Sequence, residues 1–255
     1  MGWEGYAVRT VLRQMSAPLK AAILVRRVCR ASEDLSPTES DSEAWVRMQF
    51  EAAEQEDGGL YAWLAQEACH EALFAFLEIE SALQVDYADA LAQTMVGLPL
   101  IVRRGICRNL DDEIYERHSE SFAEMRNALE LQPLKPPTAG RVARDVLLAL
   151  VALPQHRLKA LGYLGAIEAE IPWRFSELLT AAERHGVDVG DLAFLSEHVE
   201  GDAEHAANWL REVVEPACLE GPVAWQEVAR GISIRRIVAR DYWISARLAC
   251  ERETR

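Results

Sequence analysis

His198-Val-Glu-Gly-Asp202-Ala-Glu-His205 contains three side chains of the kinds that bind metals, at positions i, i+4 and i+7. On an α-helix these positions lie at about 0°, 40° and −20° around the axis, so the three side chains form one narrow stripe. Apolar residues on or beside the stripe, among them Leu195 and Trp209, indicate that it faces the protein core.

Two imidazoles and a carboxylate in an apolar core need either a hydrogen-bond network or a metal ion to satisfy them. A buried polar network without a metal is the simpler alternative, but three such groups in line favour a set of metal ligands. Imidazole combined with carboxylate, without thiolate, suits iron, manganese or zinc better than a cysteine-rich zinc site or an iron–sulfur cluster.

The composition excludes several classes of function. The chain has 255 residues, with 27 basic and 41 acidic side chains and a net charge of −14, which argues against binding to nucleic acid or anionic membranes. The five cysteines are odd in number and never closer than about 30 residues, so neither a disulfide framework nor a CxxC metal site is indicated. We expect a cytoplasmic protein with reduced thiols.

Helical periodicity dominates from about residue 43 onward, and no stretch alternates convincingly with a period of two. We expect an all-α protein in which Thr138 caps the helix that follows a proline-rich break. The predicted helices cover roughly residues 43–56, 59–82, 85–108, 111–131, 138–153, 155–171, 173–186, 190–215 and 221–251.

The N-terminal region differs in character from the rest. Residues 1–44 are predicted to form N-terminal helices and an acidic loop, and residues 45–255 a single helical domain. The apolar run from Ala21 to Val25 is far too short to span a bilayer.

Two further segments carry candidate ligands. Glu168 lies in Leu161-Gly-Tyr-Leu-Gly-Ala-Ile-Glu168, on the face of a predicted helix that also carries leucines. The segment from Arg108 to Glu120 contains Asp111, Asp112, Glu113 and His118. Glu113 and His118 are five residues apart, about 140° around an ideal helix, whereas Asp111 and His118 share a face. Either the helix is irregular here, or Asp111 replaces Glu113.

With these three segments the chain resembles the haem-oxygenase-like di-iron oxidase and oxygenase superfamily, whose fold is shared with thiaminase II and the pyrroloquinoline-quinone biosynthesis oxidase. The resemblance spans roughly residues 45–250 and implies a bundle of about seven core helices with extra N-terminal helices. Carried over position by position, the metal ligands of the family fall on Glu113, His118, Glu168, His198, Asp202 and His205.

The first iron site departs from the family pattern. Only Ile114-Tyr-Glu-Arg117 separates Glu113 from His118, where the family commonly has a longer turn with glycine. Some members of the family recruit a further carboxylate from the preceding helix. Possible donors of that carboxylate are Glu78, Glu80, Asp86 and Asp89.

The resemblance implies a non-haem di-iron enzyme with two Fe(II) ions per chain and O₂ as co-substrate. Its substrate would be a small metabolite such as an amino acid or amine, changed by N-oxygenation, desaturation or carbon–carbon cleavage. Beyond this small molecule we expect neither a nucleic-acid nor a membrane partner, and a homodimer is compatible with the sequence. Arginines that could hold a substrate carboxylate are Arg103, Arg104, Arg108, Arg141 and Arg144.

Two other functions remain open. A metal-independent, thiaminase-like hydrolase or a cofactor-free oxidase of the same fold would need a nucleophile, and Cys69 beside His70 is the one adjacent pair of suitable residues. Those two side chains point about 100° apart on a helix, which disfavours direct pairing. A non-catalytic iron-binding helper protein is the other alternative.

Overall fold

A computed structural model describes residues 17–51, 59–83, 87–115, 118–132 and 134–253. Within these ranges the regular structure is entirely helical, so the all-α prediction is confirmed. The α-helices are α2 (Ala17–Ser32), α3 (Ser42–Glu51), α4 (Leu60–Gln66), α5 (His70–Leu83), α6 (Tyr87–Thr94), α7 (Leu100–Tyr115), α8 (His118–Ala128), α9 (Thr138–Ala152), α10 (Arg157–Arg184), α11 (Ala193–Trp209), α12 (Glu215–Ala217) and α13 (Pro222–Glu253). Short 3₁₀ turns are η1 (Glu33–Leu35), η2 (Glu39–Asp41), η3 (Pro154–His156) and η4 (Val189–Leu192), and a π-helical turn, η5 (Leu210–Val214), joins α11 to α12.

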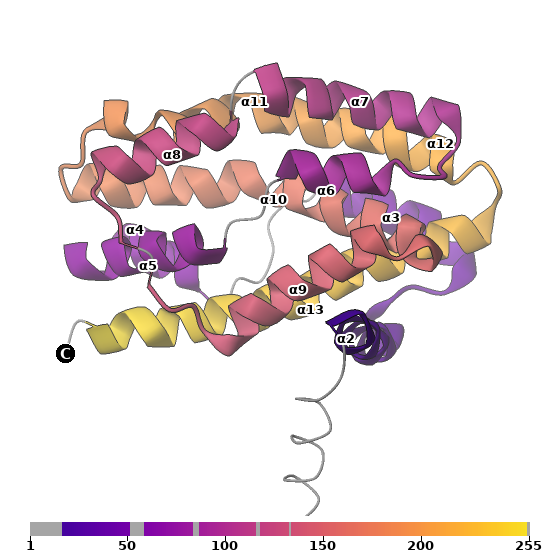
Figure 1. The fold of residues 1–255 in the computed structure, drawn as a ribbon, viewed down its shortest axis with the longest axis horizontal. Coiled ribbons are helices and arrows are strands. Elements are labelled where there is room, and N and C mark those ends of the chain that lie inside the picture. Colours follow the sequence, from indigo (N-terminus) through magenta and orange to yellow (C-terminus); the bar gives the residue numbers. More distant parts are fainter. Residues whose placement is uncertain (1–16, 52–58, 84–86, 116–117, 133, 254–255) are drawn as a thin grey trace, which may run out of the picture.

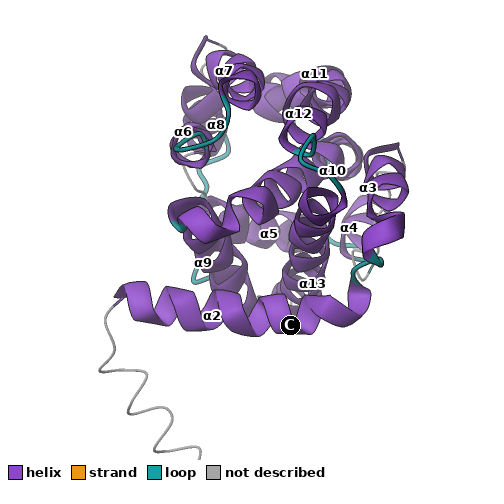
Figure 2. Cartoon of the chain, turned by 90° about the vertical axis from the view of Figure 1, so that its right-hand side faces the viewer, coloured by secondary structure: helices purple, strands orange, loops and turns teal. Residues whose placement is uncertain are grey.

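Helix α10 is the centre of the bundle. It packs against α11 on one side and against α13 on the other, while α9 lies beside α13 and α7 lies beside η5 (Figure 1). Figure 2 shows α2 crossing the bundle at the end opposite α7 and α11. Helix α2 contacts both α9 and α13 there. The proposed domain boundary near residue 44 stays a prediction.

Glycine allows the two longest helices to approach closely. A Cβ atom added to Gly162 of α10 would lie 2.1 Å from the backbone oxygen of Val228, and one added to Gly231 of α13 would lie 2.0 Å from that of Lys159. Real Cβ atoms do not come so close to a backbone oxygen. The two helices therefore cross with backbone against backbone, and only residues without a side chain fit at the crossing.

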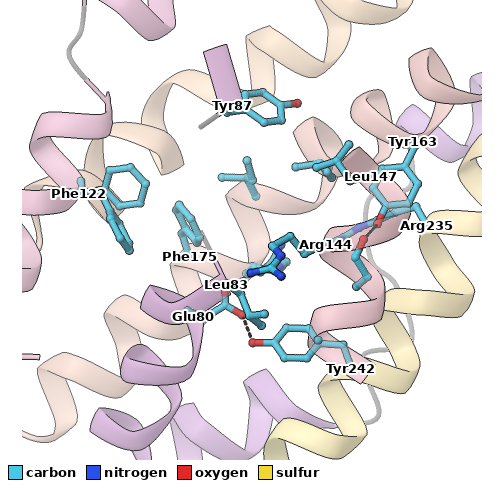
Figure 3. Close-up of a pocket in the computed structure, with 16 residues that line it drawn as sticks. Glu80, Leu83, Tyr87, Phe122, Arg144, Leu147, Tyr163, Phe175, Arg235 and Tyr242 are labelled. Atoms are coloured by element: carbon cyan, nitrogen blue, oxygen red, sulfur yellow. Dashed lines mark hydrogen bonds and ion pairs between the residues drawn. The ribbon is translucent and has the colours of Figure 1, made fainter. Parts of the chain in front are cut away.

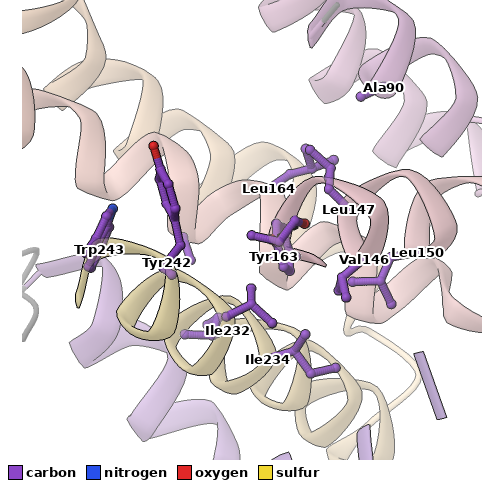
Figure 4. Packing of buried hydrophobic residues seen from close by; sticks show 14 of the residues in the cluster. Ala90, Val146, Leu147, Leu150, Tyr163, Leu164, Ile232, Ile234, Tyr242 and Trp243 are labelled. Carbon is purple, nitrogen blue, oxygen red and sulfur yellow. Dashed lines mark hydrogen bonds between the residues drawn. The ribbon is translucent and has the colours of Figure 1, made fainter. Parts of the chain in front are cut away.

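The core on the α9 side of this crossing is built from large apolar side chains. Tyr163 and Leu164 of α10, Ile232 of α13 and Leu150 of α9 are each at most 1% exposed and lie in one cluster (Figure 4). Burial of a side chain of this size stabilises a fold by about 1.5–3 kcal/mol, before conformational entropy is counted. These contacts fix the positions of α9, α10 and α13, which together form much of the pocket wall described below.

Several predicted helix boundaries are wrong. Residues 155–171 and 173–186 are not two helices, because α10 continues through Pro172. Proline lacks an N–H group, so the helical hydrogen bond to the carbonyl of Glu168 is missing, and packing along both sides of α10 keeps the helix continuous. Thr138 is the first residue of α9 rather than its cap. The N-cap is Pro137, and no side chain caps the helix there.

Other predicted helices are divided. Residues 59–82 form α4 and α5, and residues 85–108 correspond to α6 and the first part of α7. The break before α7 contains Gly97, whose φ of 78° is one that residues with a side chain rarely adopt. In the part of the chain that the structure describes, no helix is long and apolar enough to cross a membrane.

Candidate metal centre and adjoining pocket

Glu168 and His198 lie at the interface of α10 and α11. Both side chains are buried, with exposed fractions of 4% and 6%. Phe175, seven residues after Glu168 and therefore on the same face of α10, contacts the His198 ring with a centroid distance of 5.6 Å. Two of the predicted metal ligands thus lie on facing helices in a region from which water is largely excluded.

The imidazole of His198 is oriented by the backbone. Its Nδ1 lies 2.6 Å from the carbonyl oxygen of Phe194, one helical turn earlier, and the Phe194 ring packs on it at a centroid distance of 4.4 Å. A carbonyl only accepts hydrogen bonds, so Nδ1 is the donor, and in the neutral imidazole the lone pair then lies on Nε2. Histidines that bind metals commonly have this arrangement, in which one nitrogen donates to a carbonyl and the other is the ligand.

Glu168 is also held by a specific partner. The hydroxyl of Tyr87, at the start of α6, donates a hydrogen bond of 2.6 Å to Oε1 of Glu168. A hydroxyl that fixes a buried carboxylate in this way is the kind of support that carboxylate ligands of metals usually receive.

A second pair of side chains of the kinds that bind metals lies between α7 and α11. Nε2 of His205 is 3.5 Å from Oδ2 of Asp112, and the two side chains are 19% and 43% exposed. Two ligand atoms held about 2.1 Å from one ion are roughly 3.0–3.5 Å apart, so this spacing suits shared coordination. The sequence pattern favoured Glu113 or Asp111, whereas the structure brings Asp112 to His205. Asp111 is exposed and Glu113 is half-buried on α7.

The remaining predicted ligands lie beyond what the structure describes. His118 begins α8 and Asp202 lies within α11, but their side chains are outside the described residues. Among the side chains that are described, no three of His, Cys, Asp or Glu gather closely enough to hold a metal ion. The complete set of six ligands therefore stays a prediction.

The carboxylates considered as extra ligands are placed as follows. Glu78 accepts a hydrogen bond from the backbone N–H of Gln132. Glu80 accepts one from the hydroxyl of Tyr242. Asp89 is exposed on α6, and Asp86 lies outside the described residues. Glu78 thus helps to hold the turn at residues 129–132. Glu80 lies at the edge of the pocket that is described next.

This pocket adjoins the α10–α11 interface. It has a volume of about 230 Å³. Tyr87, Phe175 and Phe194 line it, and these residues also contact Glu168 or His198. Figure 3 shows Tyr87, Phe122 and Phe175 on one side of the space and Glu80 with Tyr242 on the other. The full lining is Glu80, Leu83, Tyr87, Phe122, Gly140, Ala143, Arg144, Leu147, Tyr163, Ile167, Ile171, Arg174, Phe175, Phe194, Arg235 and Tyr242.

A buried ion pair between Arg235 and Glu170 supports the wall at the polar end of the pocket. Nε and Nη2 of Arg235 donate to Oε2 of Glu170 at 2.9 and 2.6 Å, and Glu170 is fully buried. Burial alone would lower the pKa of Arg235, but the charge of Glu170, the phenol of Tyr163 and the hydrogen bonds to both together outweigh burial, and the pKa is raised. Burial, and then the carboxylate of Glu80, raise the pKa of Tyr242 well above its ordinary value, so Tyr242 stays a donor.

One of the predicted substrate arginines lines the pocket. Arg144 reaches it from α9, whereas Arg103, Arg104 and Arg108 are exposed on α7 and Arg141 donates to the carbonyl of Pro136. Sequence reasoning missed Arg174 and Arg235. Both lie in helical stretches rich in charged residues, and only the packing of α10 against α13 shows that they are buried.

The donor set fits iron. Imidazole and carboxylate groups are the ligands that non-haem iron enzymes use, and here two of them are buried, with one imidazole in the tautomer that a ligand requires. Described residues that would hold the metal are Glu168 and His198. The pair His205 and Asp112 lies about two helical turns further along α11. The position of Glu168 and His198 next to the aromatic end of the pocket would bring a bound organic molecule close to the metal.

Tyr87 offers a test of how Glu168 is held. Changing Tyr87 to Phe should weaken Fe(II) binding about 10- to 100-fold, because it removes the hydroxyl that fixes the carboxylate and leaves the ring in place. Anaerobic equilibrium titration with Fe(II) measures the effect. Tyr115→Phe is the matched control, since Tyr115 is 81% exposed, and it should bind like the wild type. Equal iron affinity in both variants would show that Glu168 does not depend on Tyr87.

The chain was compared with known proteins. Residues 74–239, more than half of the chain, match the family model described as iron-containing redox enzyme. A crystal structure of a domain of unknown function with a heme oxygenase-like fold, from Shewanella denitrificans, is similar with a TM-score of 0.58 and 15% sequence identity. The match covers 82% of this chain and 94% of that chain, and it confirms the predicted haem-oxygenase-like fold. None of the curated proteins matches. On the family match, the chain belongs to the family of iron-containing redox enzymes.

Proposed function

We propose that this protein is a non-haem di-iron oxidase or oxygenase that uses O₂ to oxidise a small metabolite. The observation that carries the proposal is the pair Glu168 and His198, which are buried on facing helices and each fixed by a hydrogen bond. They lie behind Tyr87, Phe175 and Phe194, which line a pocket of metabolite size. Membership of an iron-containing redox family supports the same chemistry.

The protein groups have separate tasks in this proposal. Bound iron would supply the electrons that activate O₂. Phe175 and Phe194 cover the His198 ring and keep water away from it. Tyr87 holds Glu168 with its hydroxyl while its ring lines the pocket, so one side chain touches both the ligand and the substrate space. The pocket then has to position the substrate against the aromatic side chains of Tyr87, Phe175 and Phe194.

The thiols give little support to the metal-free alternatives. Burial raises the pKa values of Cys218 and Cys250 to about 12, so neither is a ready nucleophile. Cys69 is exposed and is not among the residues that line the pocket. All five cysteines are free, which suits the cytoplasmic location that we propose.

Anaerobic titration with Fe(II), followed by exposure to O₂, tests the proposal. We expect the metal-free wild type to bind about two irons per chain and to develop a transient blue absorbance on mixing with O₂. His198→Ala should lose the transient and bind less iron, because it removes a buried ligand. His70→Ala is the matched control, since His70 is exposed and stacks on Phe74, away from the site. Absence of specific iron binding by the wild type would refute the di-iron proposal and leave a buried polar network.

A further inference from the structure

We infer that the polar end of the pocket is a subsite for the head group of a small zwitterion, with Arg144 binding its carboxylate and Glu80 its ammonium group. The molecule would be an α-amino acid with an apolar side chain, and that side chain would lie toward Glu168 and His198. The statement that the side chain faces a metal site rests on the proposed function. Binding of the head group by Arg144 and Glu80 does not.

Charges of both signs line this end of the pocket. The guanidinium groups of Arg144, Arg174 and Arg235 and the carboxylate of Glu80 belong to the lining, and Glu170 pairs with Arg235 from behind the wall. A molecule that carries one charge of each sign can therefore meet an opposite charge with both of its groups, which matters because charges in a partly buried site are poorly screened.

Two of the arginines are engaged within the wall. Arg235 donates twice to Glu170. Arg174 donates to the hydroxyl of Tyr61 at 2.7 Å, and it is 3.8 Å from Glu80 and 4.0 Å from Glu170. Both arginines are less than 10% exposed, so they support the wall and stay largely out of reach of a ligand.

Glu80 and Arg144 are the more accessible charges of opposite sign. Their side chains are 30% and 34% exposed, and both residues line the pocket. Figure 3 shows Arg144 directed into the same space that Glu80 and Tyr242 border. The hydroxyl of Tyr242 donates to Oε1 of Glu80 and holds the carboxylate at the edge of the pocket. Arg144 makes long contacts of 3.2 and 3.4 Å with its neighbour Asp145, which a substrate carboxylate could replace on the pocket side.

The apolar end determines which part of the ligand faces the metal site. Phe122, Phe175 and Phe194 pack against one another there, with centroid distances of 5.1 and 5.7 Å for the pairs that include Phe194. With the head group held at Glu80 and Arg144, the carbon atoms near Glu168 and His198 are those of the side chain. A volume of about 230 Å³ suits a molecule the size of an amino acid, below the range of drug-sized ligands.

Three probes that differ by one charged group test the assignment. L-Norleucine carries both charges, hexanoate lacks the amine, and pentylamine lacks the carboxylate. Isothermal titration calorimetry of the full chain, with Fe(II) under anaerobic conditions and without it, should show norleucine binding at least about tenfold more tightly than either analogue. Glu80→Gln, which keeps a partner for Tyr242, should remove the preference over hexanoate. Arg144→Gln should remove the preference over pentylamine.

The controls separate loss of the subsite from loss of the fold. Asp241→Asn removes a charge from the exposed side of α13, outside the pocket lining, and should leave the preferences of norleucine binding in place. Each variant retains one of the two preferences, so a selective loss cannot come from unfolding. Equal binding of hexanoate or pentylamine by the wild type would overturn the inference. So would unchanged preferences in both variants, or absence of binding by norleucine, leucine and phenylalanine alike.

The result of this calorimetric experiment does not depend on the result of the iron titration. Charge-dependent binding of norleucine by a chain that binds no iron would refute the di-iron proposal and keep the head-group subsite. Iron binding with an oxygen-dependent transient, but without discrimination among the three probes, would do the reverse.

Discussion

Replacing Glu170 by glutamine is expected to lower the melting temperature by about 6–20 °C. Glu170 is fully buried and accepts two hydrogen bonds from Arg235, whose guanidinium group is itself only slightly exposed. The substitution keeps the shape of the side chain but leaves a buried positive charge without its counter-charge. Removing one member of a buried ion pair costs about 3–5 kcal/mol, and each kcal/mol shifts the melting temperature of a domain of this size by about 2–4 °C.

Thermal unfolding followed by circular dichroism measures this effect. Glu43→Gln is the matched control, because Glu43 is 53% exposed and pairs with Arg47 at the surface. That variant should melt close to the wild type. A double variant, Glu170→Met with Arg235→Met, should recover much of the lost stability, since an apolar pair carries no desolvation penalty. A single Glu170→Gln variant that melts like Glu43→Gln would mean that the ion pair contributes nothing to the fold.

Gly231→Ala is expected to lower the free energy of unfolding by about 3 kcal/mol, at the upper end of the usual cost of overpacking. The new Cβ would lie 2.0 Å from the backbone oxygen of Lys159, which can move only if α10 and α13 separate. The helix propensity of alanine returns about 1 kcal/mol at most, which is too little to compensate. Gly162→Ala meets Val228 in the same way and should behave alike.

Urea unfolding gives the free energy for each variant. Gly190→Ala is the control for a glycine substitution, because the nearest atom to its added Cβ is a side-chain oxygen of Asp188 at 3.2 Å, which has to shift by only a few tenths of an ångström and can keep its hydrogen bond to the backbone N–H of residue 190. Its stability should stay within about 0.5 kcal/mol of the wild type. If Gly231→Ala were equally stable, the helices would not be held at the observed crossing.

The sequence was sufficient to predict the class of fold, because helical periodicity is a local property that each segment displays by itself. It was insufficient for the limits of α10. Proline normally ends a helix, and only the packing of α11 and α13 along both sides of α10 keeps it continuous through Pro172. Thr138 likewise has a side chain suited to capping, but α9 starts at Thr138 itself, so it cannot be the residue that precedes the helix.

The candidate site, like the fold, could be predicted from the sequence only in part. The burial of Glu168 and His198 followed from the apolar residues on their own helices. The contact between Asp112 and His205 did not, because Asp111, Asp112 and Glu113 point to different sides of α7 and their choice depends on how α7 lies against α11. Glu80 was considered as a metal ligand, yet its contact with Tyr242 depends on α13, more than 150 residues later. Pairings between distant helices leave no signal within either segment.

Because Glu80 and the pocket residues of α13 lie far apart in the sequence, the pocket can form only late during synthesis of the described residues. The pocket wall joins Glu80 to Arg235 and Tyr242, so a ribosome must release the chain beyond α13 before the wall can close. Until then the faces of α9 and α10 that pack against α13 lack their cover, and the buried charge of Glu170 lacks Arg235. Completion of the binding site therefore waits until α13 has left the ribosome, and a nascent chain cannot hold a substrate in this pocket before then.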